Sequence, residues 1–146
     1  MEGFNVKLAF LYAGQGAQHV GMGRDLYEIY PAFRQVLDSA PVDFDLKKLC
    51  FDGPEDQLND TRYTQPCMVA FAAGVTALLR EAGITPDYAA GLSLGEYSAL
   101  HAAGVFDADT AVELVAFRGK AMEEAAAGRP SAMVAVLGLD LSLIHI

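Results

Sequence analysis

The chain has 146 residues, with 10 basic and 19 acidic side chains, a formal net charge of −9, 53% hydrophobic and 20% charged residues. This composition is typical of one soluble globular domain and argues against a disordered tail. The negative charge opposes unspecific binding to nucleic acid and to anionic membranes, so we expect neither as a partner. Residues 1–10 contain one base, Lys7, and an apolar run much shorter than the roughly 18 residues of a membrane span. We therefore expect a cytoplasmic protein.

The two cysteines predict packed, reduced thiols. Cys50 and Cys67 are too far apart for a Cys-x-x-Cys site and too few for a disulfide scaffold. We expect no metal site and no bound cofactor.

In the first half of the chain, apolar runs alternate with turn residues. They predict a strand at residues 6–12, a glycine loop at 13–22, helices at 23–30, 31–40 and 43–50, and a surface connection with about one helical turn at 51–63.

In the second half, Thr64-Gln65-Pro66 favours a helix start, because a hydroxyl can cap free amides and proline lacks the amide that would go unpaired. Thr110-x-x-Glu113 has capping-box spacing in the last helix. The expected elements are helices at 64–82, 94–103 and 107–127, strands at 87–92 and 131–139, and a turn at 128–130.

Strands separated by helices predict an α/β sheet with parallel pairing. Only three strands are expected in the whole chain, and the last leads into an apolar end with nothing after it to cover it. We therefore expect a truncated chain.

The sharpest motif is Gly91-Leu92-Ser93-Leu94-Gly95, between a predicted strand and a predicted helix. This is the pattern of a nucleophile elbow, in which a tight turn projects the serine oxygen above the sheet. The helix N-terminus then offers free amides to a developing oxyanion. The alternative is a serine in an ordinary glycine-containing turn.

A serine nucleophile needs a base within hydrogen-bond reach. His101 lies about 12 Å along the helix from Ser93, so we expect a packed or surface histidine. His19 lies in the glycine loop and is either a solvated side chain or a group that approaches the serine. His145 lies at the end of the chain, in a segment that we do not expect to be native.

The loop Gly14-Gln15-Gly16-Ala17-Gln18 does not fit a nucleotide site. A dinucleotide fingerprint would need glycine where His19 stands, and a Walker loop would need lysine where Met22 stands. The loop is either a simple tight turn or a source of backbone amides for a second oxyanion donor.

Ordered blocks of the chain resemble the malonyl-CoA:acyl-carrier-protein transacylases, a family that includes the polyketide synthase acyltransferase domains. The resemblance covers residues 6–140. The blocks are Gly14-Gln15-Gly16, Val20-Gly21-Met22-Gly23, Tyr63-Thr64-Gln65-Pro66, Gly91 to Leu100, Arg118-Gly119-Lys120 and Ala132-Met133 with Gly138-Leu139-Asp140.

The resemblance implies a role for five residues. Ser93 would be the acylated nucleophile, and Gln15 and Leu94 would give the oxyanion-hole amides. Arg118 would bind the malonyl carboxylate, which suits a guanidinium because it can donate two parallel bonds. Gln65 would line the substrate pocket. Without the resemblance, Arg118 would be a solvated helix charge.

Two departures from the family pattern affect these expectations. Leu92 stands where the family's elbow usually has histidine. The family's catalytic histidine lies beyond Ile146, so we expect the 146-residue chain alone to be inactive.

The resemblance also implies the fold and domain organisation. Residues 1–130 would be the N-terminal part of an incomplete hydrolase-like, parallel-sheet subdomain, and residues 131–140 the first strand of a ferredoxin-like insert. Residues 141–146 depart from the polar helix start expected there, and we expect a non-native tail.

The resemblance implies transfer of malonyl from malonyl-CoA, a substrate rather than a bound cofactor, to the phosphopantetheine thiol of acyl carrier protein in fatty-acid biosynthesis. The alternatives are a polyketide-type acyltransferase domain, a serine esterase, and a noncatalytic fragment that binds carrier protein.

Overall fold

The computed structural model describes residues 6–128 and 138, and within them it shows an α/β fold. Strands β1 (Ala9–Tyr12) and β2 (Tyr88–Gly91) pair in parallel, with Ala9 opposite Tyr88 and Tyr12 opposite Gly91. The helices are α1 (Arg24–Ile29), α2 (Pro31–Ser39), α3 (Leu46–Asp52), α4 (Glu55–Leu58), α5 (Thr61–Glu81), α6 (Gly95–Ala102) and α7 (Ala108–Ala126).

These elements confirm the predicted order, although both strands are shorter than the apolar runs that predicted them. The predicted strand at 131–139 and most of the turn at 128–130 lie outside the described residues.

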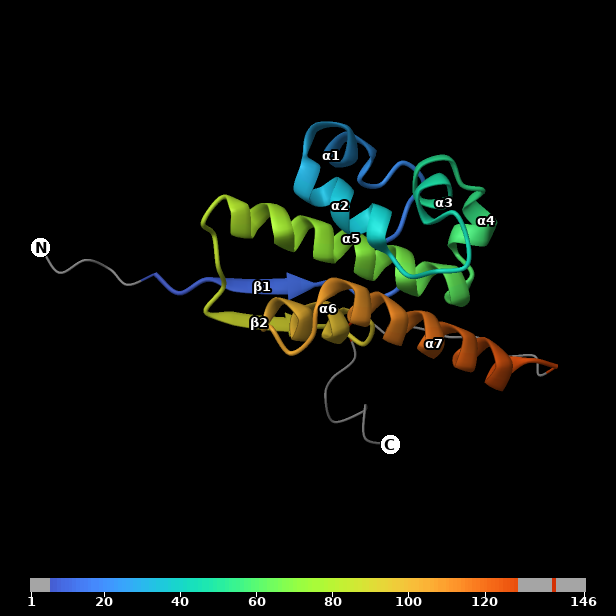
Figure 1. The fold of residues 1–146 in the computed structure, drawn as a ribbon. Coiled ribbons are helices and arrows are strands. Elements are labelled where there is room, and N and C mark those ends of the chain that lie inside the picture. The colour runs from blue at the N-terminus through green and yellow to red at the C-terminus, as the bar shows by residue number, and fades with distance from the viewer. Residues whose placement is uncertain (1–5, 129–137, 139–146) are drawn as a thin grey trace, which may run out of the picture.

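Helix α5 is the centre of the fold. Figure 1 shows α1 and α2 on the side of α5 away from the strands, while α6 and α7 lie on the strand side. Phe33 of α2 packs edge-on against Phe71 of α5, with ring centroids 5.8 Å apart. Val112 and Val115 of α7 are buried in the same core. Apolar side chains of α5 therefore pack against α2 on one side and against α7 on another.

The predicted start of α5 is wrong by three residues. Asp60 is the N-cap, and its carboxylate accepts a hydrogen bond from the Arg62 amide. Pro66 consequently lies inside the helix. The Thr64 hydroxyl is not a cap, because it donates to backbone carbonyls at Leu58 and Asp60. The helix therefore begins at the upstream aspartate cap and not at the residues before the proline.

The predicted capping box in the last helix is also wrong. Asp107 is the N-cap of α7 and accepts a hydrogen bond from the Thr110 amide, 2.8 Å away. Thr110 therefore lies within the first turn, and Glu113 is one turn too far along the helix to close a box with it.

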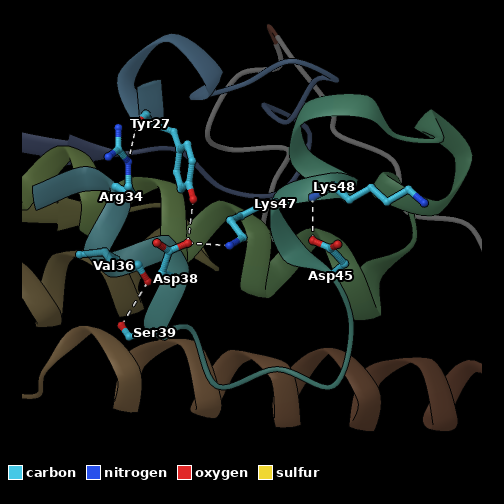
Figure 2. Close-up of polar contacts among 8 residues, drawn as sticks. All are labelled: Tyr27, Arg34, Val36, Asp38, Ser39, Asp45, Lys47 and Lys48. Carbon is cyan, nitrogen blue, oxygen red and sulfur yellow. Dashed lines mark hydrogen bonds and ion pairs between the residues drawn. The ribbon is translucent and has the colours of Figure 1, made fainter. Parts of the chain in front are cut away.

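A polar cluster ties α1, α2 and α3 together (Figure 2). The Asp38 carboxylate accepts hydrogen bonds from the Tyr27 hydroxyl, 2.9 Å away, and the Lys47 ammonium, 2.6 Å away. The Arg34 guanidinium lies over the Tyr27 ring, 5.4 Å from its centroid. The hydrogen bond from Lys47 lowers the pKa of the Asp38 carboxyl.

Both cysteines are free and buried, as predicted. A hydrogen bond with Cys50, together with burial, raises the pKa of the Cys67 thiol well above its usual range. A thiol in this state is protonated and a poor nucleophile, so Cys67 acts as a core residue.

One part of the surface is unusually apolar. Leu11 is 79% exposed and Tyr88 is 64% exposed on the two-stranded sheet. Two strands are fewer than a stable sheet normally needs.

Among the described helices, none combines the length and apolar character that crossing a membrane requires.

Candidate active site

Ser93 lies in the turn between β2 and α6, with its side chain exposed. Its φ is 51°, and among the described non-glycine residues it is the one with positive φ. A non-glycine residue rarely adopts this left-handed conformation unless the surrounding structure enforces it. Ser93 therefore lies in a sharp turn with a strand before it and a helix after it.

Close backbone approach explains the two glycines of the motif. A Cβ on Gly91 would collide with the backbone of Gly95 and Glu96, and a Cβ on Gly95 would collide with the carbonyl oxygen of Tyr12. The turn can therefore fold back over the end of β1 only because both positions lack a side chain.

The loop after β1 lies against the serine turn. The Leu92 amide donates to the Tyr12 carbonyl, 3.1 Å away. The Gln15 side chain holds the loop to α5 by donating from Nε2 to the Thr61 hydroxyl, 2.9 Å away. Within residues 6–128, the amides of Gln15 and Leu94 donate no hydrogen bond to a protein acceptor. Both amides can therefore donate a hydrogen bond to an oxygen atom of a bound molecule.

Arg118 of α7 reaches the serine. Its Nη2 donates to Ser93 Oγ at 3.2 Å, and its Nη1 donates to Gln65 Oε1 at 2.7 Å. Arg118 is half-buried, so it is not a fully solvated helix charge. The closeness of α7 to α5 depends on Gly119, where a Cβ would lie 2.9 Å from the Thr61 carbonyl oxygen.

Gln65 is fully buried and uses both ends of its amide. Its oxygen accepts from Arg118, and its Nε2 donates to Met122 Sδ, 3.3 Å away. Because Arg118 and Met122 are one turn apart on α7, they contact Gln65 from the same helix face. This double contact fixes which end of the amide points toward the guanidinium.

No histidine of the described segment hydrogen-bonds to Ser93. His101 is 7% exposed, so of the two predicted states, packed or surface, it is the packed one, and its Nδ1 lies 3.1 Å from the Phe106 carbonyl oxygen. Burial lowers the pKa of His101. His19 is exposed in the glycine loop. His145 lies outside the described residues. Within the described residues, no group of three or more His, Cys, Asp or Glu side chains could hold a metal ion.

Residues 9–142 match the family model described as the acyl transferase domain. The chain belongs to the acyl transferase domain family. The malonyl CoA-acyl carrier protein transacylase of Bacillus subtilis (strain 168) is 44% identical over 136 residues, which are 92% of this chain and 43% of the relative.

Solved structures of the family have the same fold. The malonyl CoA-acyl carrier protein transacylase from Clostridium perfringens superimposes with a TM-score of 0.87 at 39% identity, over 96% of this chain and 45% of that one. A malonyl-transacylase solved in complex with its type II PKS acyl-carrier protein gives a TM-score of 0.78 at 41% identity, over 82% of this chain and 40% of that one. The chain thus spans less than half the length of these relatives.

Proposed function

We propose that this chain is the N-terminal part of an enzyme that transfers a malonyl group from malonyl-CoA to the phosphopantetheine thiol of acyl carrier protein, in fatty-acid biosynthesis. The observation that carries the proposal is the Arg118 guanidinium, 3.2 Å from the Ser93 oxygen. A cation held beside an exposed serine fits an acyl group that ends in a carboxylate. Relatives that bear the name of this activity support the same conclusion.

The proposed reaction has two steps, and Ser93 acts in both. Its oxygen attacks the thioester carbonyl of malonyl-CoA, the C–S bond breaks, and CoA leaves as the thiol. The phosphopantetheine thiol then attacks the seryl ester and takes the malonyl group, and the serine hydroxyl is restored. The amides of Gln15 and Leu94 would donate to the oxyanion of each tetrahedral intermediate.

Arg118 would select the acyl group. Once the ester has formed, its guanidinium can donate two parallel hydrogen bonds to the malonyl carboxylate, which an acetyl group lacks. Gln65 would position Arg118 through the 2.7 Å bond rather than meet substrate first, because its side chain is buried.

The general base would lie beyond Ile146. A serine hydroxyl without a base is a weak nucleophile, so we expect the 146-residue chain alone to turn over poorly. We infer that residues 1–130 are part of a hydrolase-like subdomain, that 131–140 begin a ferredoxin-like insert, and that 141–146 are not native. The exposed apolar side chains on the sheet support an incomplete domain.

A transfer assay with the full-length enzyme tests the proposal. Malonyl-CoA and holo acyl carrier protein are mixed with wild-type or Ser93→Ala enzyme, and the mass of the carrier protein is followed. We expect a malonyl adduct with the wild type and none above background with Ser93→Ala. Hydrolysis of neutral esters without transfer would support a serine esterase instead. Binding of carrier protein without any transfer would support a noncatalytic role.

A polyketide pathway is the second candidate. The malonyl-transacylase solved with its type II PKS acyl-carrier protein has the same fold as this chain. The chemistry at Ser93 is identical in both cases, and only the carrier protein differs. Comparing the transfer rates to a fatty-acid and a polyketide carrier protein separates the two.

A further inference from the structure

Tyr97 lies on the first turn of α6, four residues after Ser93, and its ring faces Arg118. The distance from Arg118 Cζ to the ring centroid is 5.8 Å, within the range of a cation–π contact. The side chain is half-buried and packs against the hydrophobic core. Core packing therefore fixes the ring, and within residues 6–128 its hydroxyl makes no hydrogen bond.

Three groups hold the Arg118 guanidinium from different directions. Gln65 Oε1 accepts from one nitrogen, Ser93 Oγ accepts from another, and the Tyr97 ring covers a face. The contact with Ser93 changes during the reaction, because an ester oxygen is a poorer acceptor than a hydroxyl. After acylation, Gln65 and Tyr97 are the two contacts that still define where the guanidinium points.

We propose that Tyr97 is a positioning residue whose aromatic face keeps Arg118 directed at the acyl group on Ser93. The ring thereby contributes to the preference for acyl groups that carry a carboxylate. This inference rests on the proposed transferase function. It assigns the effect to the ring and not to the hydroxyl, so phenylalanine should replace tyrosine and an aliphatic side chain should not.

The test measures kcat/KM of the full-length enzyme for malonyl-CoA and for acetyl-CoA. Tyr97→Leu should lower the malonyl-to-acetyl ratio about two- to fivefold, mainly through a higher KM for malonyl-CoA. Tyr97→Phe should keep the wild-type ratio. Tyr30→Leu is the matched control, because Tyr30 is 44% exposed and joins α1 to α2, which lie on the side of α5 away from the strands.

Each outcome distinguishes this inference from the proposed function. A wild-type enzyme without preference for malonyl contradicts the proposed function. A wild type with that preference and a folded Tyr97→Leu that keeps it overturn the role of Tyr97. An equal fall in rate for both acyl groups indicates a purely structural role and also overturns it. If Tyr97→Leu does not fold, Tyr97→Met fills a similar volume without an aromatic face and should show the same loss of preference.

Discussion

Replacing Arg118 by alanine removes the group that we propose selects the acyl chain. In the structure, its guanidinium spans Ser93 Oγ at 3.2 Å and Gln65 Oε1 at 2.7 Å. Arg118 would also donate two hydrogen bonds to the charged malonyl carboxylate, and bonds of this kind contribute about 1.5–3 kcal/mol each. Because Arg118 is half-buried, solvent screening favours the lower end. We expect kcat/KM for malonyl-CoA to fall on the order of 10²-fold, while the value for acetyl-CoA changes little.

The same substitution should lower stability, because it leaves the buried Gln65 oxygen without its donor. An unsatisfied buried acceptor costs about 1–3 kcal/mol. Adding Gln65→Leu removes that acceptor, so the double variant should recover part of the loss in urea unfolding. Arg24→Ala is the matched control, because Arg24 of α1 forms an exposed ion pair with Asp52 of α3.

The assay is steady-state transfer from both CoA esters, with urea unfolding of the same proteins. A folded Arg118→Ala enzyme that keeps the wild-type preference for malonyl over acetyl would refute the proposed role of Arg118. An Arg24→Ala enzyme whose preference changes as much as that of Arg118→Ala would refute it too.

Three further predictions concern the fold. Gly95→Ala should lower stability by about 1–3 kcal/mol or abolish soluble expression, because its Cβ would collide with the Tyr12 carbonyl; a wild-type melting temperature would contradict this. Asp60→Ala should cost about 1 kcal/mol in urea unfolding, because α5 loses its N-cap, and no change would mean that the cap is dispensable. The pKa of Asp38 is lowered in the folded state, so its stabilisation is present above the unfolded value of about 3.9 and is lost as pH falls through the folded value. Asp38→Asn, which weakens the pair with Lys47, should flatten acid unfolding in this range.

Local signals in the sequence predicted much of the architecture. The beginnings and ends of several elements follow from residues close to them in the sequence. Examples are the glycines of the Ser93 turn, the apolar run of α5 and the glycines after α5 and α6, each of which affects the backbone within a few residues. The start of α5 was missed because Pro66 is a strong marker of a helix start, yet the carboxylate of Asp60 capped the helix one turn earlier.

The approach of Arg118 to Ser93 could not be derived from local pattern. It depends on how closely α7 crosses α5 at Gly119, which is a tertiary property. The sequence around Arg118, taken alone, is equally compatible with a solvated charge on a helix. The resemblance to a family supplied the pairing of Arg118 with Ser93. Neither the local pattern nor the resemblance pointed to the contact of the Tyr97 ring with Arg118 or to that of Met122 with Gln65. Both contacts exist only in the folded arrangement.

Trapping of the acyl-enzyme shows whether Ser93 is the nucleophile. Full-length enzyme is mixed with malonyl-CoA in the absence of carrier protein, quenched in acid, digested and mapped by mass spectrometry. We predict one malonyl group on the peptide that contains Ser93, and none on that peptide from Ser93→Ala enzyme. A malonyl group on any other side chain, or a Ser93→Ala enzyme that still becomes acylated and transfers, would contradict the account.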